Sequence, residues 1–139
     1  MDIPQLILEL THDEGRKSSV YQDSLGFWTI GVGHMVDARR GGGLSDHIID
    51  QILRDDVAVV AAELDNKLPW WRNLDNKRQN VIANMAFNMG VPKLQGFVHF
   101  LAALKAGDYA TAATEMLDSL WAKQVGDRAD RLSNVIRGE

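Results

Sequence analysis

The stretch that decides the fold of this 139-residue chain is EGRKSSVYQDSLGFWTIGVGH, residues 14–34. β-favouring side chains gather on both sides of residues 22–26, where Asp, Ser and Gly supply turn chemistry. Two glycines, Gly31 and Gly33, then loosen the second strand. The sequence therefore predicts a small β-hairpin.

Two acids, Glu14 and Asp23, flank the first expected strand. Two carboxylates fixed by a compact hairpin are the minimum equipment for acid–base cleavage of a glycosidic bond. Glu14 follows an expected helix, whose negative C-terminal end disfavours an ionised carboxylate and so favours a general acid. Taken singly, Glu14 is better interpreted as a surface acid, and Asp23 as a turn residue that bonds its own backbone.

Two further residues in the stretch could take part in chemistry, but each also has an ordinary structural interpretation. Thr29 has a hydroxyl, but threonine in a strand is more often simply a β-former. His34 could bind a metal, yet the chain has no cysteine and the other histidines are not patterned relative to it. We therefore expect a structural histidine and no metal site.

Helical periodicity covers the rest of the chain. We expect a short helix ending near residues 13–15, a long helix from the N-cap Ser45 to Leu68, and a stop at Pro69. Later helices should begin at the caps Asp75, Asp108 and Asp127, with further helical segments at 97–106 and near 120–121. The predicted fold is α+β, a single domain over 1–139. It comprises a small β lobe (14–44), a connecting helix (45–68) and a mainly helical lobe (69–139 with 1–13).

Composition limits the function classes. The net charge is −4 and no long Lys/Arg run exists, so nucleic-acid binding is not expected. The N-terminal residues have no signal-peptide pattern, and no apolar run is long enough for stable membrane insertion. We expect a soluble monomer without a signal peptide.

Three blocks in a fixed order resemble the T-even phage lysozyme family, glycoside hydrolase family 24. The first is E-G-(x)5-Y-x-D-(x)2-G-(x)2-T-I-G-x-G-H, from Glu14 to His34. The second is NMAFNMG, residues 84–90, which is similar to the central helix of the family. The third joins Trp121 and Gln124 to an R-A-x-R segment that starts at Arg128. Together the blocks span most of the chain.

The resemblance implies a lysozyme-like fold and roles for these residues. Glu14 would be the general acid, Asp23 the second carboxylate, and Thr29 the hydroxyl that orients the attacking water. Arg128 would pair with Glu14, and the supporting residues would be His34, Asn88 and Gln124, the two amides hydrogen-bonding sugar groups. The family is regarded as inverting, which requires about 6.5–9.5 Å between the carboxyls.

The implied activity is that of a muramidase without a cofactor, acting on bacterial peptidoglycan at a site between the two lobes. It would cleave the β-1,4 bond between N-acetylmuramic acid and N-acetylglucosamine. The expected context is a phage endolysin that stays in the host cytoplasm before release and acts in the periplasm or on the cell wall. An antimicrobial role, as in defence against bacteria, is also expected. A baseplate, effector or prophage lysozyme is an alternative, as is a muramidase-like domain that binds glycan without turnover.

The chain departs from the family in two respects. Only ten residues separate His34 from Ser45, so we expect a smaller β lobe with a truncated third strand or a loop. The acidic net charge contrasts with the basic surface common in the family. Trp121 is expected in the core, and packing is favoured over sugar stacking for Trp70 and Trp71.

Overall fold

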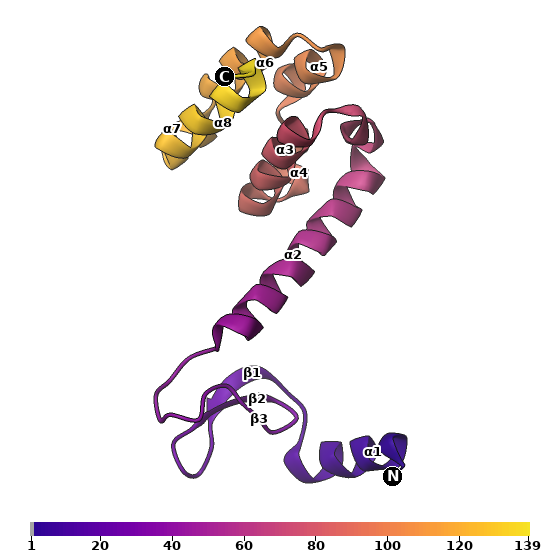
Figure 1. Ribbon diagram of the computed structural model, residues 1–139, viewed down its shortest axis with the longest axis vertical. Coiled ribbons are helices and arrows are strands. Elements are labelled where there is room, and N and C mark those ends of the chain that lie inside the picture. The colour runs from indigo at the N-terminus through magenta and orange to yellow at the C-terminus, as the bar shows by residue number, and fades with distance from the viewer. Residues whose placement is uncertain (1) are drawn as a thin grey trace. The chain divides into compact units, whose positions relative to one another are not determined.

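The computed structural model describes residues 2–139 and shows an α+β architecture (Figure 1). The chain divides into two compact units, one up to Leu53 and one from Arg54 to Glu139. These two units do not test the expected lobes, which stay a prediction: a β lobe at 14–44, a connecting helix at 45–68 and a helical lobe at 69–139 with 1–13.

The first unit opens with α1, Ile3–Glu14. Asp2 caps this helix because its carboxylate accepts a hydrogen bond from the Gln5 amide at 3.1 Å. Pro4 is tolerated because it lies in the first turn, where no intrahelical amide bond is lost. The helix ends at Gly15, whose φ of 73° suits glycine, as the sequence predicted. Glu14 is thus the last residue of α1.

A three-stranded antiparallel sheet follows, in the order β1–β2–β3. The strands are β1 (Lys17–Gln22), β2 (Trp28–Gly31) and β3 (His34–Met35). Thr29 is paired with Tyr21 on one side and Met35 on the other, which places it in the middle of the sheet. The hairpin is confirmed, and the third strand is only two residues long, as the short connection to Ser45 predicted.

The long helix α2, Asp46–Lys67, begins in the first unit and ends in the second. Its last turns are fixed to the 3₁₀ helix η1, Pro69–Asn73. Asp65 accepts hydrogen bonds from Trp71 Nε1 at 2.7 Å and from Arg72 Nε at 2.6 Å. The Arg72 guanidinium also lies 4.2 Å from the Trp71 ring centre, a cation–π contact. The turn after Pro69 is therefore held to α2 by side chains.

Six helices build the rest of the second unit. Asp75 and Asp108 cap α3 and α6 through their carboxylates, as predicted. The expected cap at Asp127 is wrong: Gly126 is the N-cap residue of α8, and no side chain caps that helix. The helices are α3 (Asn76–Met89), α4 (Val91–Gln95), α5 (Val98–Ala106), α6 (Tyr109–Leu117), α7 (Leu120–Val125) and α8 (Asp127–Arg137).

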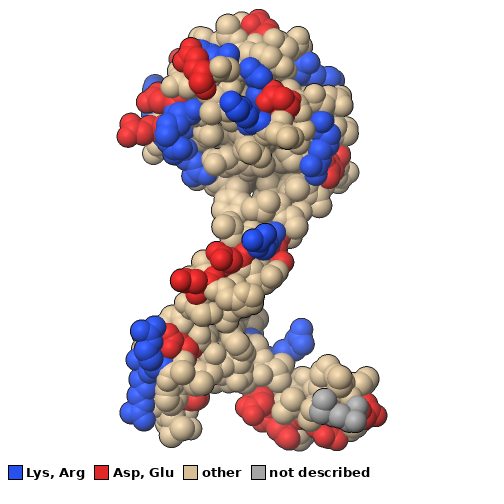
Figure 2. Space-filling model, in the orientation of Figure 1, with Lys and Arg blue, Asp and Glu red and all other residues tan. Residues whose placement is uncertain are grey.

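The hydrophobic core lies in the second unit, between Leu64 and Ile136. Phe100 and Leu104 of α5 are almost fully buried, and burial of each such side chain contributes about 1.5–3 kcal/mol. Trp121 is 7% exposed, which confirms it as a core residue, and Trp71 is 3% exposed, which confirms that it packs. Figure 2 shows acidic and basic side chains interspersed on the visible face of this unit.

Candidate functional site

Asp23 holds the turn between β1 and β2. Its Oδ1 accepts hydrogen bonds from the backbone amides of Leu25 and Phe27, both at 2.9 Å. The structural role that the sequence suggested is therefore present. Within residues 2–53, the other carboxylate oxygen, Oδ2, accepts no hydrogen bond. Asp23 can hold its turn with one oxygen and contact water with the other.

Glu14 lies against the glycine-rich end of the sheet. An ideal Cβ on Gly33 would be 2.9 Å from Glu14 Cδ and from Oε2. The carboxyl of Glu14 thus occupies the side-chain position that Gly33 leaves empty. Within residues 2–53, this carboxylate forms no hydrogen bond or ion pair. The sequence did not reveal this contact, since Gly33 there indicated a loosening of the strand.

Thr29 and His34 lie on the same sheet but differ in exposure. Thr29 is 5% exposed, and its Oγ1 donates to the Phe27 carbonyl at 3.2 Å. His34 is exposed in β3 and pairs with Ile30 of β2. The Thr29 hydroxyl is the more restrained of the two groups. It lies in the strand next to the turn that Asp23 holds.

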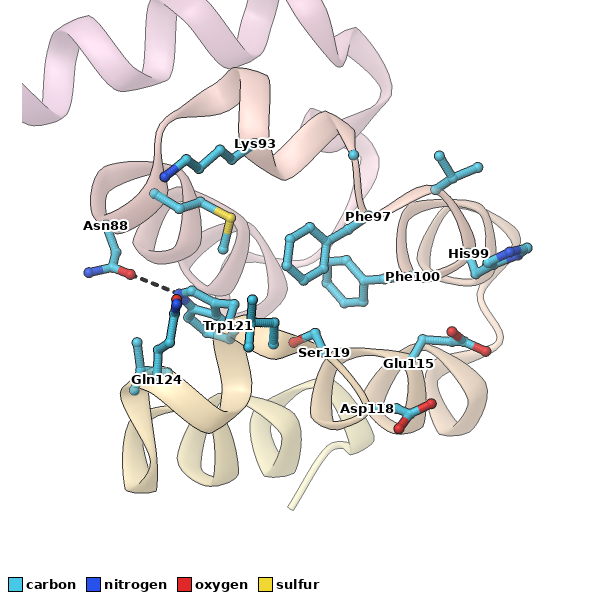
Figure 3. A pocket seen from close by; sticks show the side chains of 15 residues that line it. Asn88, Lys93, Phe97, His99, Phe100, Glu115, Asp118, Ser119, Trp121 and Gln124 are labelled. Atoms are coloured by element: carbon cyan, nitrogen blue, oxygen red, sulfur yellow. Dashed lines mark hydrogen bonds between the residues drawn. The ribbon is translucent and has the colours of Figure 1, made fainter.

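Asn88 and Gln124 line one pocket in the second unit, with a volume of about 810 Å³ (Figure 3). Asn88 Oδ1 accepts a hydrogen bond from Trp121 Nε1 at 2.8 Å. The aromatic rings of Phe97 and Trp121 meet edge to face at the pocket, with centres 6.5 Å apart. The structure therefore brings two of the predicted supporting residues together around an aromatic wall.

Charged side chains at the same pocket were missed by the sequence analysis. Lys93 of α4 lies near Asn88, while Glu115 and Asp118 lie at the other end of the pocket (Figure 3). Glu115 and Asp118 are three residues apart in sequence, which brings them to one side of α6 and its C-cap. Helical spacing could have grouped these two acids, but it could not show which surface they share.

Arg128 is held by Asn84 of α3. Its Nε donates to Asn84 Oδ1 at 2.9 Å, and Nη2 donates to the Asn84 carbonyl at 3.3 Å. Within residues 54–139, Nη1 donates no hydrogen bond, so this part of the guanidinium can bind an anion. Asn84 thus orients an arginine 44 residues away in the sequence.

The loop after β3 is organised by Asp37. Its carboxylate accepts hydrogen bonds from the amides of Arg39 at 2.8 Å and Gly43 at 3.1 Å. The Arg39 side chain also donates to it, with Nη2 at 2.8 Å from Oδ2. The hydrogen bonds from the Arg39 side chain and amide lower the pKa of Asp37 to about 2. A local acid–arginine cluster therefore fixes the short connection to α2.

In residues 2–139, no three His, Asp or Glu side chains gather as ligands for a metal ion. In the same residues, no helix is both long and apolar enough to cross a membrane. The absence of a cofactor remains a prediction.

Known proteins resemble this chain over nearly its whole length. The sequence model of the family described as phage lysozyme matches residues 11–137. The protein named "Probable T4-type lysozyme 1" of Dictyostelium discoideum is 28% identical, over 91% of this chain and 90% of that protein. "Endolysin" of Acyrthosiphon pisum secondary endosymbiont phage 1 is 31% identical, over 83% of this chain and 77% of that protein.

A third relative is a larger protein. "Pre-baseplate central spike protein Gp5" of Enterobacteria phage T4 is 30% identical over 91% of this chain, but the match covers 26% of Gp5. The Dictyostelium match runs over 153 positions, more than this chain's 139 residues, so that relative contains segments with no counterpart here.

The α+β fold and the family match define a glycoside hydrolase of the lysozyme type. The chain belongs to the phage lysozyme family.

Proposed function

We propose that this protein hydrolyses the β-1,4 bond between N-acetylmuramic acid and N-acetylglucosamine in bacterial peptidoglycan. The observation that carries the proposal is that the family match, residues 11–137, contains Glu14, Asp23 and Thr29. In the structure these residues occupy one small unit, the first at the end of α1 and the others in the hairpin.

In the proposed reaction, Glu14 donates a proton to the glycosidic oxygen as the bond to the muramic acid C1 breaks. Asp23, through its unbonded Oδ2, accepts a hydrogen bond from the attacking water, and Thr29 helps to orient that water. The water adds to C1 and loses a proton to the carboxylate. Because the water enters opposite the leaving group, the anomeric configuration inverts. A separation of about 6.5–9.5 Å between the carboxyls is required and remains a prediction.

The second unit supplies the proposed substrate contacts. Asn88 and Gln124 present amide groups at the 810 Å³ pocket, whose size suits a saccharide or peptide part of peptidoglycan. The free Nη1 of Arg128 would bind an anionic group of the substrate. His34 is proposed only as a supporting residue, since it is exposed and sits beside the strand that contains Thr29.

Product analysis tests the bond and the stereochemistry. After digestion of purified sacculi, borohydride reduction should label muramic acid at the new reducing ends, and early NMR spectra should show the α-anomer. Label on glucosamine at the new reducing ends would contradict the proposed bond. Early spectra that show the β-anomer would contradict inversion. Glu14→Gln keeps the side-chain size but cannot donate the proton, so it should not clear a sacculus suspension.

The alternative function is binding of glycan without turnover. If neither wild type nor Glu14→Gln clears sacculi while both sediment with them, the binding alternative replaces the catalytic proposal. If both clear sacculi equally, Glu14 is not the acid. Activity on N-acetylglucosamine oligomers that lack muramic acid would point to a chitinase-like specificity.

For the biological role we propose cell lysis by a phage endolysin, because a protein of similar length named "Endolysin" aligns over 77% of its own length. The match to Gp5 favours a second role, a lysozyme domain of a tail structure. Expression of the chain in a bacterial host with and without a membrane-permeabilising protein tests the endolysin role. Lysis only on permeabilisation supports the endolysin role, and no lysis in either case contradicts it.

A further inference from the structure

Gly33 and Glu14 are in van der Waals contact in the first unit. The ideal Cβ position of Gly33 lies 2.9 Å from both Cδ and Oε2 of Glu14, and 3.0 Å from Cγ. These separations are shorter than carbon contacts allow, since carbon atoms pack at about 3.5–4.0 Å. A side chain at position 33 and the present position of the Glu14 carboxyl therefore exclude each other.

We propose that Gly33 is a positioning residue for catalysis: the absence of its side chain creates the space that fixes the Glu14 carboxyl. The inference rests on the proposed function, in which Glu14 is the general acid. It assigns a role in the reaction to a backbone position that forms no part of the acid–base chemistry itself.

The other glycines of this unit help to separate two reasons for a glycine: a positive φ, and space for a neighbouring side chain. Gly15, Gly26, Gly31 and Gly41 also have φ between +69° and +83°. An ideal Cβ on each of them would meet no atom within 4 Å. Their conformation alone explains why glycine stands there. Gly33, at φ +65°, has the same conformational need and in addition the contact with a carboxyl.

The contact matters because little else in this unit restrains Glu14. Within residues 2–53, its carboxylate forms no hydrogen bond or ion pair, and a glutamate side chain has three rotatable bonds. A methyl group at position 33 would push the flexible end of this side chain aside, in addition to the backbone strain that any L side chain meets at this φ. Displacement of a catalytic group by about 1 Å can cost about 10²-fold in rate.

The kinetic test uses Gly33→Ala with Gly31→Ala as its matched control, since both introduce a methyl group at a positive φ, +65° and +69°. With soluble peptidoglycan strands as substrate, Gly33→Ala should lower kcat about 10²-fold and leave KM within about twofold. Gly31→Ala should show the same fall in melting temperature and retain its kcat. An equal loss of kcat in both variants, or no loss in Gly33→Ala, overturns the inference.

A second measurement does not depend on activity or on the folding of a variant. In the wild-type protein, NMR should show a nuclear Overhauser effect between the Glu14 Hγ and Gly33 Hα protons. Its absence overturns the inference. If instead the effect is present while Glu14→Gln keeps full activity, the contact stands and the proposed function fails.

Discussion

Asn88 and Trp121 join the C-terminal half of α3 to the first turn of α7 by a hydrogen bond of 2.8 Å. An indole nitrogen can only donate, so the side-chain oxygen of Asn88 must be the atom that faces it. The NH₂ group of Asn88 is then the part left to donate to a ligand. A core tryptophan thus determines which hydrogen-bonding group Asn88 offers at the pocket.

Replacement of Asn88 by alanine should affect both stability and substrate binding. The indole N–H of the 7%-exposed Trp121 would lose its partner, which should lower the free energy of unfolding by about 1–3 kcal/mol. Loss of one hydrogen bond to the substrate should raise KM about two- to tenfold. Urea unfolding and kinetics on soluble peptidoglycan strands measure the two effects.

Gln124→Ala provides the control for this prediction. Gln124 lines the same pocket but is exposed, and within residues 54–139 its side chain forms no hydrogen bond. The variant should change the unfolding free energy by less than about 0.5 kcal/mol while still raising KM. Equal stability of the Asn88→Ala and Gln124→Ala proteins would show that the bond to Trp121 contributes nothing.

Local sequence patterns predicted the features that depend on neighbouring residues. The caps at Asp75 and Asp108 were predictable because each carboxylate bonds amides two or three residues along the chain. The end of the long helix was predictable from Pro69. Trp121 was predictable as core from its place in a matched block.

Features set by less regular backbone were not predictable in this way. Asp127 resembles a cap, yet Gly126, with φ 55° and ψ −124°, takes that place. The short helix α4 begins directly after the Gly90 cap of α3, with Pro92 in its first turn, where proline is tolerated. The contact of Gly33 with Glu14 joins residues nineteen positions apart through the fold of the hairpin, so no local pattern encodes it.

Asn84 should be required to orient Arg128. Asn84→Ala removes the acceptor at 2.9 Å from Nε, and a hydrogen bond to a charged group contributes about 1.5–3 kcal/mol. If the guanidinium binds the substrate as proposed, this loss should lower kcat/KM at least tenfold. Asn84→Asp keeps an acceptor of the same shape and should retain most of the activity. Equal kinetics for Asn84→Ala and wild type would show that the orientation of Arg128 by Asn84 does not contribute to activity.

The loop after β3 should depend on the ionisation of Asp37. The hydrogen bonds from the Arg39 side chain and amide hold the pKa of Asp37 at about 2, below its ordinary 3.8. Because the folded pKa is the lower one, the stabilising contribution is complete above about pH 4 and is lost as the pH falls through about 2. A ¹³C NMR titration of the Asp37 carboxyl measures this pKa. Asp37→Asn should lose the amide protection of Arg39 and Gly43 at neutral pH.

Gly42 should tolerate a side chain as poorly as Gly33 does, in this case because of the Asp37 carboxyl. An ideal Cβ on Gly42 would overlap the Asp37 carboxyl, whereas one on the next residue, Gly43, would meet no atom within 4 Å. Neither glycine has a positive φ, so the two alanine variants differ in the overlap and not in backbone strain. Gly42→Ala should displace the carboxylate from the Arg39 and Gly43 amides and raise the pKa of Asp37 toward its ordinary value. Gly43→Ala should leave that pKa at about 2. The same ¹³C titration distinguishes the two, and an unchanged pKa in Gly42→Ala would mean that the loop can hold Asp37 in more than one way.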